Sequence, residues 1–173
     1  PNGSGKTTLF NSIVGFHPID SGTINFDGKE ISKMRVQRIA RLGMLRTFQQ
    51  TRIFSKMNCV KNMLISAAHH NTSWFDMFKI YPDELTERAE KLLEFVGLYK
   101  KRFLISGDLS FGQQKLLEFA MALMNEPKVL LLDEPTAGIN PTLINGLVDR
   151  LKRANQEFGI TLFVIEHNMR VVM

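Results

Sequence analysis

The stretch that decides the fold opens the chain and reads Pro1-Asn2-Gly3-Ser4-Gly5-Lys6-Thr7-Thr8. Its glycines let backbone N–H groups converge on phosphates, and the helix that follows points its positive end at them. Lys6 would neutralise charge on β- and γ-phosphates, and the Thr7 hydroxyl would reach magnesium. A chance glycine-rich turn is the alternative, because the motif's leading glycine would precede Pro1. The sequence predicts a phosphate-binding loop made of Asn2, Gly3, Ser4, Gly5, Lys6, Thr7 and Thr8.

A second stretch, Val129-Leu130-Leu131-Leu132-Asp133-Glu134-Pro135, places two acids after four apolar residues. A short continuous apolar run is typical of a strand buried on both faces of a parallel sheet. Ligands of open α/β sheets bind beyond the carboxyl ends of such strands. We therefore expect Asp133 to hold magnesium through water and Glu134 to polarise the attacking water. Two acids in an ordinary turn are the alternative, which the upstream loop disfavours.

The remaining segments predict an α/β architecture. A helix should leave the loop and stop at Gly15, and alternating residues around Asp27-Gly28 predict an antiparallel hairpin. Apolar residues repeat at helical spacing up to Gly97. A second buried strand at 160–165 should follow a helix that Asn140 caps and Gly159 ends. Strand, helix and strand in this order favour a mostly parallel sheet.

Bulk properties restrict the function without selecting it. The net charge of +5 and the pI of about 9.5 are compatible with any anionic partner. The lone Cys59 cannot form an internal disulfide, which favours a reducing compartment. No run approaches the roughly 18 apolar residues of a membrane span, so a membrane role would need another polypeptide. His17, His69 and His70 lack ligand-like companions, so we assign them no metal.

The most discriminating stretch is Leu109-Ser110-Phe111-Gly112-Gln113-Gln114-Lys115. Ser110 and Gln113 form a capping box that opens a helix, and an ordinary capped helix is the simplest interpretation. The stretch also resembles Leu-Ser-Gly-Gly-Gln, the signature of the ATP-binding cassette (ABC) family, with Phe111 at a position that varies among these proteins. Its place just before the acidic strand fits that family. The resemblance implies that Ser110, Gly112 and Gln113 bind the γ-phosphate held by another subunit.

Two further pieces resemble the same family. Thr47-Phe48-Gln49 is similar to the glutamine loop, in which Gln49 would contact magnesium and the attacking water, with Gln50 as an adjacent rival. Ile165-Glu166-His167 is similar to the switch histidine segment, in which His167 would reach the γ-phosphate. The resemblance thus implies catalytic roles for Glu134, His167 and Gln49, and magnesium ligation by Thr7, Gln49 and Asp133.

The family resemblance also implies the domain layout. We expect one incomplete ABC ATPase domain over 1–173, truncated at both ends. A RecA-like P-loop NTPase core with the antiparallel β arm would occupy 1–50 and 125–173. A helical subdomain carrying the signature would be inserted over 51–124.

Finer details resemble the importer subfamily for branched-chain amino acids and related hydrophobic solutes. These details lie in residues 46–54, 137–141 and 166–173. Asn140 stands where most ABC cassettes have Asp, and Asn is common at this position in the importer subfamily. The resemblance implies ATP and Mg²⁺ as cofactors, a second ATP-binding subunit, transmembrane permease subunits, and indirectly a solute-binding protein. It places the chain at the cytoplasmic face of the membrane, with no nucleic acid partner.

Other functions stay open at this point. One is a soluble ABC ATPase acting on nucleic acid or ribosomes, and another is the ATPase of a urea or lipopolysaccharide transporter. A phosphate-loop kinase or GTPase would leave Ser110 to Gln113 unexplained. The aromatic stretch 74–78 would be a docking surface or part of the helical core.

Overall fold

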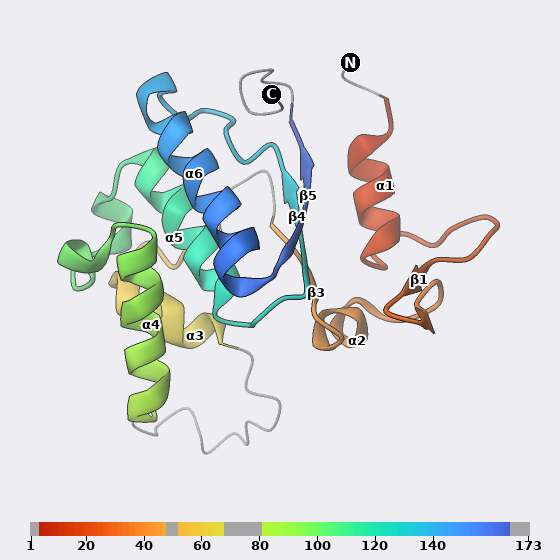
Figure 1. The fold of residues 1–173 in the computed structure, drawn as a ribbon, viewed down its shortest axis with the longest axis horizontal. Coiled ribbons are helices and arrows are strands. Elements are labelled where there is room, and N and C mark those ends of the chain that lie inside the picture. Colours follow the sequence, from red (N-terminus) through yellow and green to blue (C-terminus); the bar gives the residue numbers. More distant parts are fainter. Residues whose placement is uncertain (1–3, 48–51, 68–80, 167–173) are drawn as a thin grey trace.

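The computed structural model describes residues 4–47, 52–67 and 81–166 (Figure 1). Its centre is a parallel sheet of three strands in the order β3-β4-β5, spanning Met44–Arg46, Val129–Asp133 and Thr161–Ile165. The middle strand β4 is the most deeply buried, as its continuous apolar run predicts. Because the strands are parallel, their carboxyl ends meet at one edge of the sheet. The predicted parallel α/β sheet is therefore confirmed.

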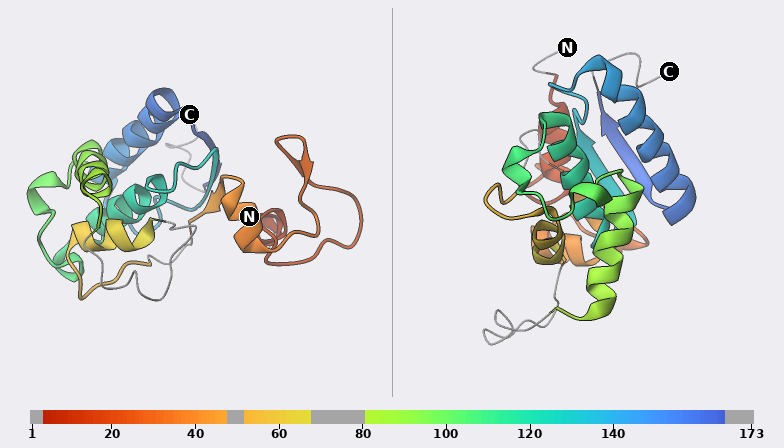
Figure 2. Two further views of the ribbon diagram at one scale, coloured as in Figure 1. Left: turned by 90° about the horizontal axis from the view of Figure 1, so that it is seen from below. Right: turned by 90° about the vertical axis from the view of Figure 1, so that its left-hand side faces the viewer.

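Helices cover both faces of this sheet (Figures 1 and 2). On one face lie α3 (Cys59–Ser66), α4 (Asp83–Phe95), α5 (Phe111–Leu123) and α6 (Pro141–Phe158), and on the other lies α1 (Lys6–Ile13). Side chains alternate along β4, so that Leu130 and Leu132 join one hydrophobic cluster while Leu131 joins the other. The sheet thus separates two apolar cores.

The helix ends follow the sequence signals. Gly15, Gly97 and Gly159 have φ angles of 78°, 78° and 66°, each just beyond the end of a helix. These left-handed positions favour glycine and stop a helix. At the start of α6, the Asn140 side chain accepts a hydrogen bond from the Thr142 N–H at 3.1 Å, and Pro141 fills the first helical position. The predicted caps and stops of these helices are confirmed.

The predicted β arm is also present, as a two-stranded hairpin. Strands β1 (Asn25–Phe26) and β2 (Lys29–Glu30) pair antiparallel across Asp27 and Gly28. Both turn residues have positive φ, 50° and 73°, as a two-residue hairpin turn of type I′ requires. The short helix α2 (Val36–Arg41) then leads into β3.

The described part of 51–124 contains helices and one isolated β-bridge. Two short 3₁₀ helices, η2 (Tyr99–Lys101) and η3 (Ser106–Asp108), connect α4 to α5. A single hydrophobic cluster runs from α3 and α4 through α5 to β4 and α6. The helical character of this segment is thus as expected, while its separation from the core as a subdomain stays a prediction. Within the described residues, no helix is both long and apolar enough to cross a membrane.

Candidate nucleotide-binding site

The start of α1 has a glycine at its N-cap. Gly5 occupies the N-cap with a left-handed φ of 80°, so the N-cap residue itself supplies no side-chain hydrogen bond, and no acid lies in the first turn. Thr7 and Thr8 are exposed, and the Lys6 ammonium donates to the Ser4 hydroxyl at 2.8 Å. Helix N-termini present N–H groups and a positive dipole end, which together bind anions. The geometry of this loop suits phosphate.

At the carboxyl end of β4, Asp133 is buried and Glu134 follows at a bend. Asp133 is 4% exposed. Glu134 has a positive φ of 49°, which is uncommon for a residue with a side chain, and its N–H donates to the Ile165 carbonyl at 2.8 Å. Such backbone strain concentrates at functional sites, where surrounding structure holds it. The bend gives the two acids separate positions at one strand end.

Arg46, at the end of β3, connects the acidic strand to α1. One terminal guanidinium nitrogen donates to Asp133 Oδ2 at 2.7 Å, and the other donates to Asn11 Oδ1 on α1. The guanidinium also lies over the Phe10 ring, 5.5 Å from its centroid. Residues four apart share one face of a helix, so the face of α1 that carries Asn11 also carries Thr7. Figure 1 shows the start of α1 and the carboxyl end of β4 toward the same end of the sheet.

The oxygen donors at this end fit magnesium. Mg²⁺ prefers oxygen ligands, keeps several waters, and binds through one or two carboxylates together with substrate phosphates. The Asp133 carboxylate and the Thr7 hydroxyl are of this kind, while Lys6 can balance phosphate charge. The predicted roles of Thr7 and Asp133 are compatible with this arrangement and stay predictions.

A second contact at the sheet edge joins the ends of β4 and β5. The Glu166 carboxylate accepts from the Thr136 N–H at 2.8 Å and from the Thr136 hydroxyl at 2.6 Å, both at Oε1. Thr136 lies in the turn after Glu134, and the Ala137 N–H donates back to the Glu134 carbonyl at 3.0 Å. Glu166 thus fixes the turn that carries Glu134.

The start of α5 has the predicted capping box. The Ser110 hydroxyl accepts from the Gln113 N–H at 3.4 Å, and Gln113 Oε1 accepts from the Ser110 N–H at 3.2 Å. The Lys101 ammonium also donates to Gln113 Oε1 at 3.1 Å. A Cβ on the buried Gly112 would lie 3.1 Å from a methyl of the exposed Leu143, so a side chain there would displace the Leu143 side chain slightly.

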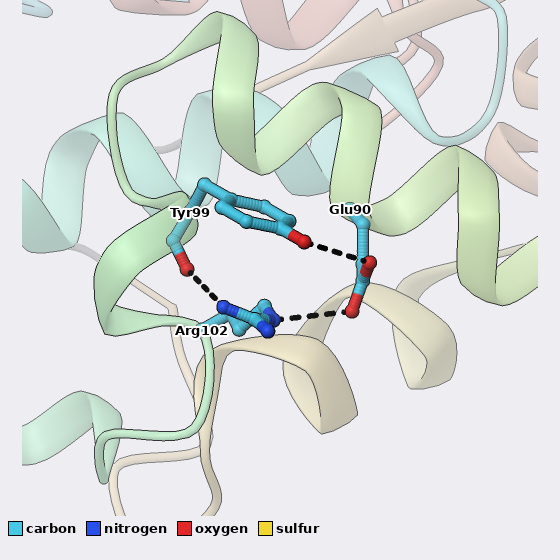
Figure 3. A network of polar contacts seen from close by, with 3 residues as sticks. All are labelled: Glu90, Tyr99 and Arg102. Atoms are coloured by element: carbon cyan, nitrogen blue, oxygen red, sulfur yellow. Dashed lines mark hydrogen bonds and ion pairs between the residues drawn. The ribbon is translucent and has the colours of Figure 1, made fainter.

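A polar network holds the segment that brings Lys101 to α5 (Figure 3). The Arg102 guanidinium donates to Glu90 Oε1 at 3.2 Å and to the Tyr99 carbonyl at 3.1 Å. The Tyr99 hydroxyl donates to Glu90 Oε2 at 3.5 Å. These contacts hold η2 against α4, and η2 carries Lys101, whose ammonium donates to Gln113 at the start of α5.

The predicted site residues lie on different elements of the fold. Lys6 and Asp133 belong to one end of the sheet, whereas α5, with Ser110, lies on the opposite face from α1 (Figure 1). Among the predicted site residues, Asn2, Gly3, Gln49 and His167 lie outside the described residues, as do the rival Gln50 and the stretch 74–78.

Sequence reasoning assigned no role to Arg46, Asn11, Thr136 or Glu166. Arg46 directly precedes the Thr47-Phe48-Gln49 motif, and Glu166 directly precedes His167. For Arg46 and Glu166, this adjacency is the feature of the sequence that indicates a role near the site. Nothing in the spacing showed that Arg46 pairs with a residue 87 positions away.

The fold and the positions of the predicted residues are those of a class of nucleotide-binding proteins. A parallel α/β sheet, a glycine-led helix start and acids at a neighbouring strand end together are the phosphate-loop nucleotide-binding fold. Comparison with known proteins then identifies the family. The model of the ABC transporter family matches residues 1–137, and the chain belongs to this family.

Individual relatives agree with this assignment. The chain is 39% identical to the high-affinity branched-chain amino acid transport ATP-binding protein BraF of Pseudomonas aeruginosa, over all of this chain and 71% of that protein. It is 36% identical, with a TM-score of 0.86, to a crystal structure of the ADP conformation of an ATP-binding cassette from an ABC transporter, covering 99% and 69% of the two chains.

A dimeric cassette structure in a post-hydrolysis state, bound to ADP and Pi, is 25% identical with a TM-score of 0.78, covering 99% of this chain and 73% of that one. The predicted ABC fold and the predicted family are confirmed.

Proposed function

We propose that this chain is the ATP-binding and ATP-hydrolysing subunit of an importer for branched-chain amino acids. The observation that supports the ATPase part of the proposal is Arg46, which bonds both Asp133 and Asn11 on α1, the helix that follows the phosphate-loop motif. A relative that is 39% identical over the whole chain is named for branched-chain amino acid transport, which supports this substrate class.

In the proposed site, each residue has a distinct task. The start of α1 and Lys6 hold the β- and γ-phosphates, and Thr7 and Asp133 hold magnesium, which supplies charge neutralisation at the phosphates when bound. Glu134 polarises the attacking water from its strained bend. Gln49 and His167 would complete the site. Glu166 positions the turn after Glu134 through Thr136.

The second half of each site would come from another subunit. The exposed Ser110, with Gly112 and Gln113, starts a helix on the far face of the sheet from α1. This placement supports a sandwich of two ATP-binding subunits, and the dimeric cassette with 25% identity supports it further. Closing on ATP and opening after hydrolysis would move transmembrane permease subunits. The chain would then work at the cytoplasmic face of the membrane.

Reconstitution tests the substrate class. The intact protein is assembled in proteoliposomes with permease subunits and a solute-binding protein encoded beside it, and ATP hydrolysis is measured. We expect leucine, isoleucine or valine to stimulate hydrolysis and to accumulate in an ATP-dependent way, and urea to do neither.

Other outcomes contradict parts of the proposal. Stimulation by urea alone would reassign the substrate. Stimulation by RNA or ribosomes, without any permease, would replace transport by a soluble ABC ATPase function. A protein that binds no nucleotide would remove the enzymatic assignment itself.

A further inference from the structure

The contact between Arg46 and Asp133 is an ion pair inside the protein. Each side chain is 5% exposed, and Arg46 Nη2 lies 2.7 Å from Asp133 Oδ2. A buried carboxylate requires a compensating charge, because removing one partner of such a pair leaves the other charge uncompensated. Arg46 therefore lies where it can act as a counter-ion to Asp133.

Other contacts hold Arg46 at this place independently of Asp133. Its second terminal nitrogen donates to Asn11, and its guanidinium lies over the Phe10 ring. Both residues belong to α1, the helix that begins at the phosphate loop. The positive charge of Arg46 is thus a fixed part of the surroundings of any ion that approaches Asp133.

A cation arriving at Asp133 meets this charge. Two positive ions that share one carboxylate repel each other, and the repulsion is strong where water is scarce. Nucleotide phosphates reverse the balance, because their negative charge attracts both cations. A metal that arrives with nucleotide is therefore favoured over a metal that arrives alone.

We propose that Arg46 is the resident counter-ion of Asp133, and that Mg²⁺ competes with this ion pair when it enters the site. The inference rests on the proposed function, since it takes Asp133 as the magnesium ligand. Arg46 then limits how strongly Mg²⁺ enhances nucleotide binding. Arg46 also weakens the binding of Mg²⁺ in the absence of nucleotide.

The test measures ADP binding to the intact protein by calorimetry, in EDTA and in saturating Mg²⁺. The dissociation constant in EDTA divided by that in Mg²⁺ measures how much the metal enhances ADP binding. A substitution that changes ADP affinity equally in both conditions leaves this ratio unchanged. In Arg46→Met, we expect this ratio to rise by about tenfold or more, because a neighbouring unit charge contributes at least that much at an effective dielectric constant of about 20.

Two matched variants control for the shape of the site. Arg46→Lys keeps the charge, and its ratio should stay within about threefold of wild type on this electrostatic account. Arg41→Met removes an exposed arginine on α2 and should leave the ratio unchanged.

The alternatives give different results. An unchanged ratio in Arg46→Met would show a purely structural role and overturn the proposal. A lower ratio would overturn it as well, because Arg46 would then orient Asp133 for the metal. Failure of wild type to bind ADP would instead contradict the proposed function.

A measurement on the wild-type protein covers the case in which Arg46→Met does not fold. Guanidinium ¹⁵N–¹H signals are recorded with ADP, before and after Mg²⁺ is added, and Arg46→Lys assigns the Arg46 signals. We expect the Arg46 signals to shift on addition of Mg²⁺. Signals that stay in place would show that the ion pair persists and would overturn the proposal.

Discussion

The helix starts of α1 and α5 both carry predicted phosphate-binding residues, but they satisfy their backbone groups in different ways. At α1, Gly5 provides no side-chain cap, and the first turn is exposed at Thr7 and Thr8. At α5, Ser110 and Gln113 cap each other, and Lys101 donates to the same Gln113 oxygen. One helix start is prepared for an anion, while the other is already internally satisfied.

The difference indicates an order of events. A helix start whose N-cap is glycine has no capping side chain of its own to displace before phosphate binds. A capping box must rearrange, or accept phosphate at the groups that remain, before it binds. We therefore infer that nucleotide binds first at α1 of one subunit and is then contacted by α5 of a second subunit.

The largest effect that this comparison predicts is at the α1 start. Lys6→Ala should weaken ATP binding by about 100-fold or more, because a hydrogen bond to a charged group contributes up to about 3 kcal/mol and the phosphate charge loses its partner. Calorimetry on the intact protein measures the affinity. Lys29→Ala, on the exposed hairpin strand β2, is the control. Unchanged affinity in Lys6→Ala would remove the phosphate loop from the site.

Substitution of Glu134 should separate binding from chemistry. Glu134→Gln keeps the shape and hydrogen bonding but removes the charge, so ATP binding should survive while hydrolysis falls by about 10²-fold or more. We expect the variant to accumulate as an ATP-bound dimer in size-exclusion chromatography. Turnover near the wild-type rate would move the catalytic role to His167 or Gln49. Loss of ATP binding would instead show that the carboxylate supports the structure of the site.

A smaller effect is expected where Glu166 holds the turn after Glu134. Glu166→Ala removes the acceptor for both Thr136 donors and should lower the hydrolysis rate by about tenfold, as loss of a supporting contact does. Glu166→Gln keeps an acceptor oxygen and should restore most of the rate. Single-turnover hydrolysis distinguishes the two variants, and equal loss in both would argue against positioning through Thr136.

The smallest effect concerns stability and compares the two helix starts directly. Ser110→Ala removes a side-chain cap and should lower the free energy of unfolding by about 1 kcal/mol. Ser4→Ala should change it by less than about 0.5 kcal/mol, because α1 has no side-chain cap to lose. Urea denaturation measures both values. Equal destabilisation by the two variants would contradict the distinction between a capped and an uncapped start.

Local signals explain how much of the fold the sequence predicts. The buried strand β4, the Asp27-Gly28 hairpin and the cap at Asn140 depend on residues close in sequence, and each is present as expected. Strand β5 forms where expected, but the prediction that it is buried on both faces is wrong, because Thr161 and Phe163 are exposed and only Ile165 is buried. Strand β3, by contrast, has three residues, too few for a hydrophobic period to appear. Its position beside β4 depends on packing across the chain.

The site shows the same limit. The motifs identify Lys6, Asp133 and Ser110 because their residue types and order are characteristic. They do not reveal that Arg46 pairs with Asp133 or that Glu166 holds Thr136, since both contacts join segments far apart in sequence. Contacts of this kind arise only when the sheet brings strand ends together.

The central claim, that an uncapped α1 start in one subunit meets the α5 start of another, is tested most directly with a mixed dimer. One protomer carries Lys6→Ala and its partner carries Ser110→Arg, and the ATP that stays trapped between the subunits after size-exclusion chromatography is counted in a Glu134→Gln background that prevents turnover. If sites are shared between subunits, one site combines both defects and the other contains neither. The account therefore predicts one ATP bound per mixed dimer. A mixed dimer that binds no ATP would show that each Ser110 serves the Lys6 loop of its own chain, and it would contradict the account.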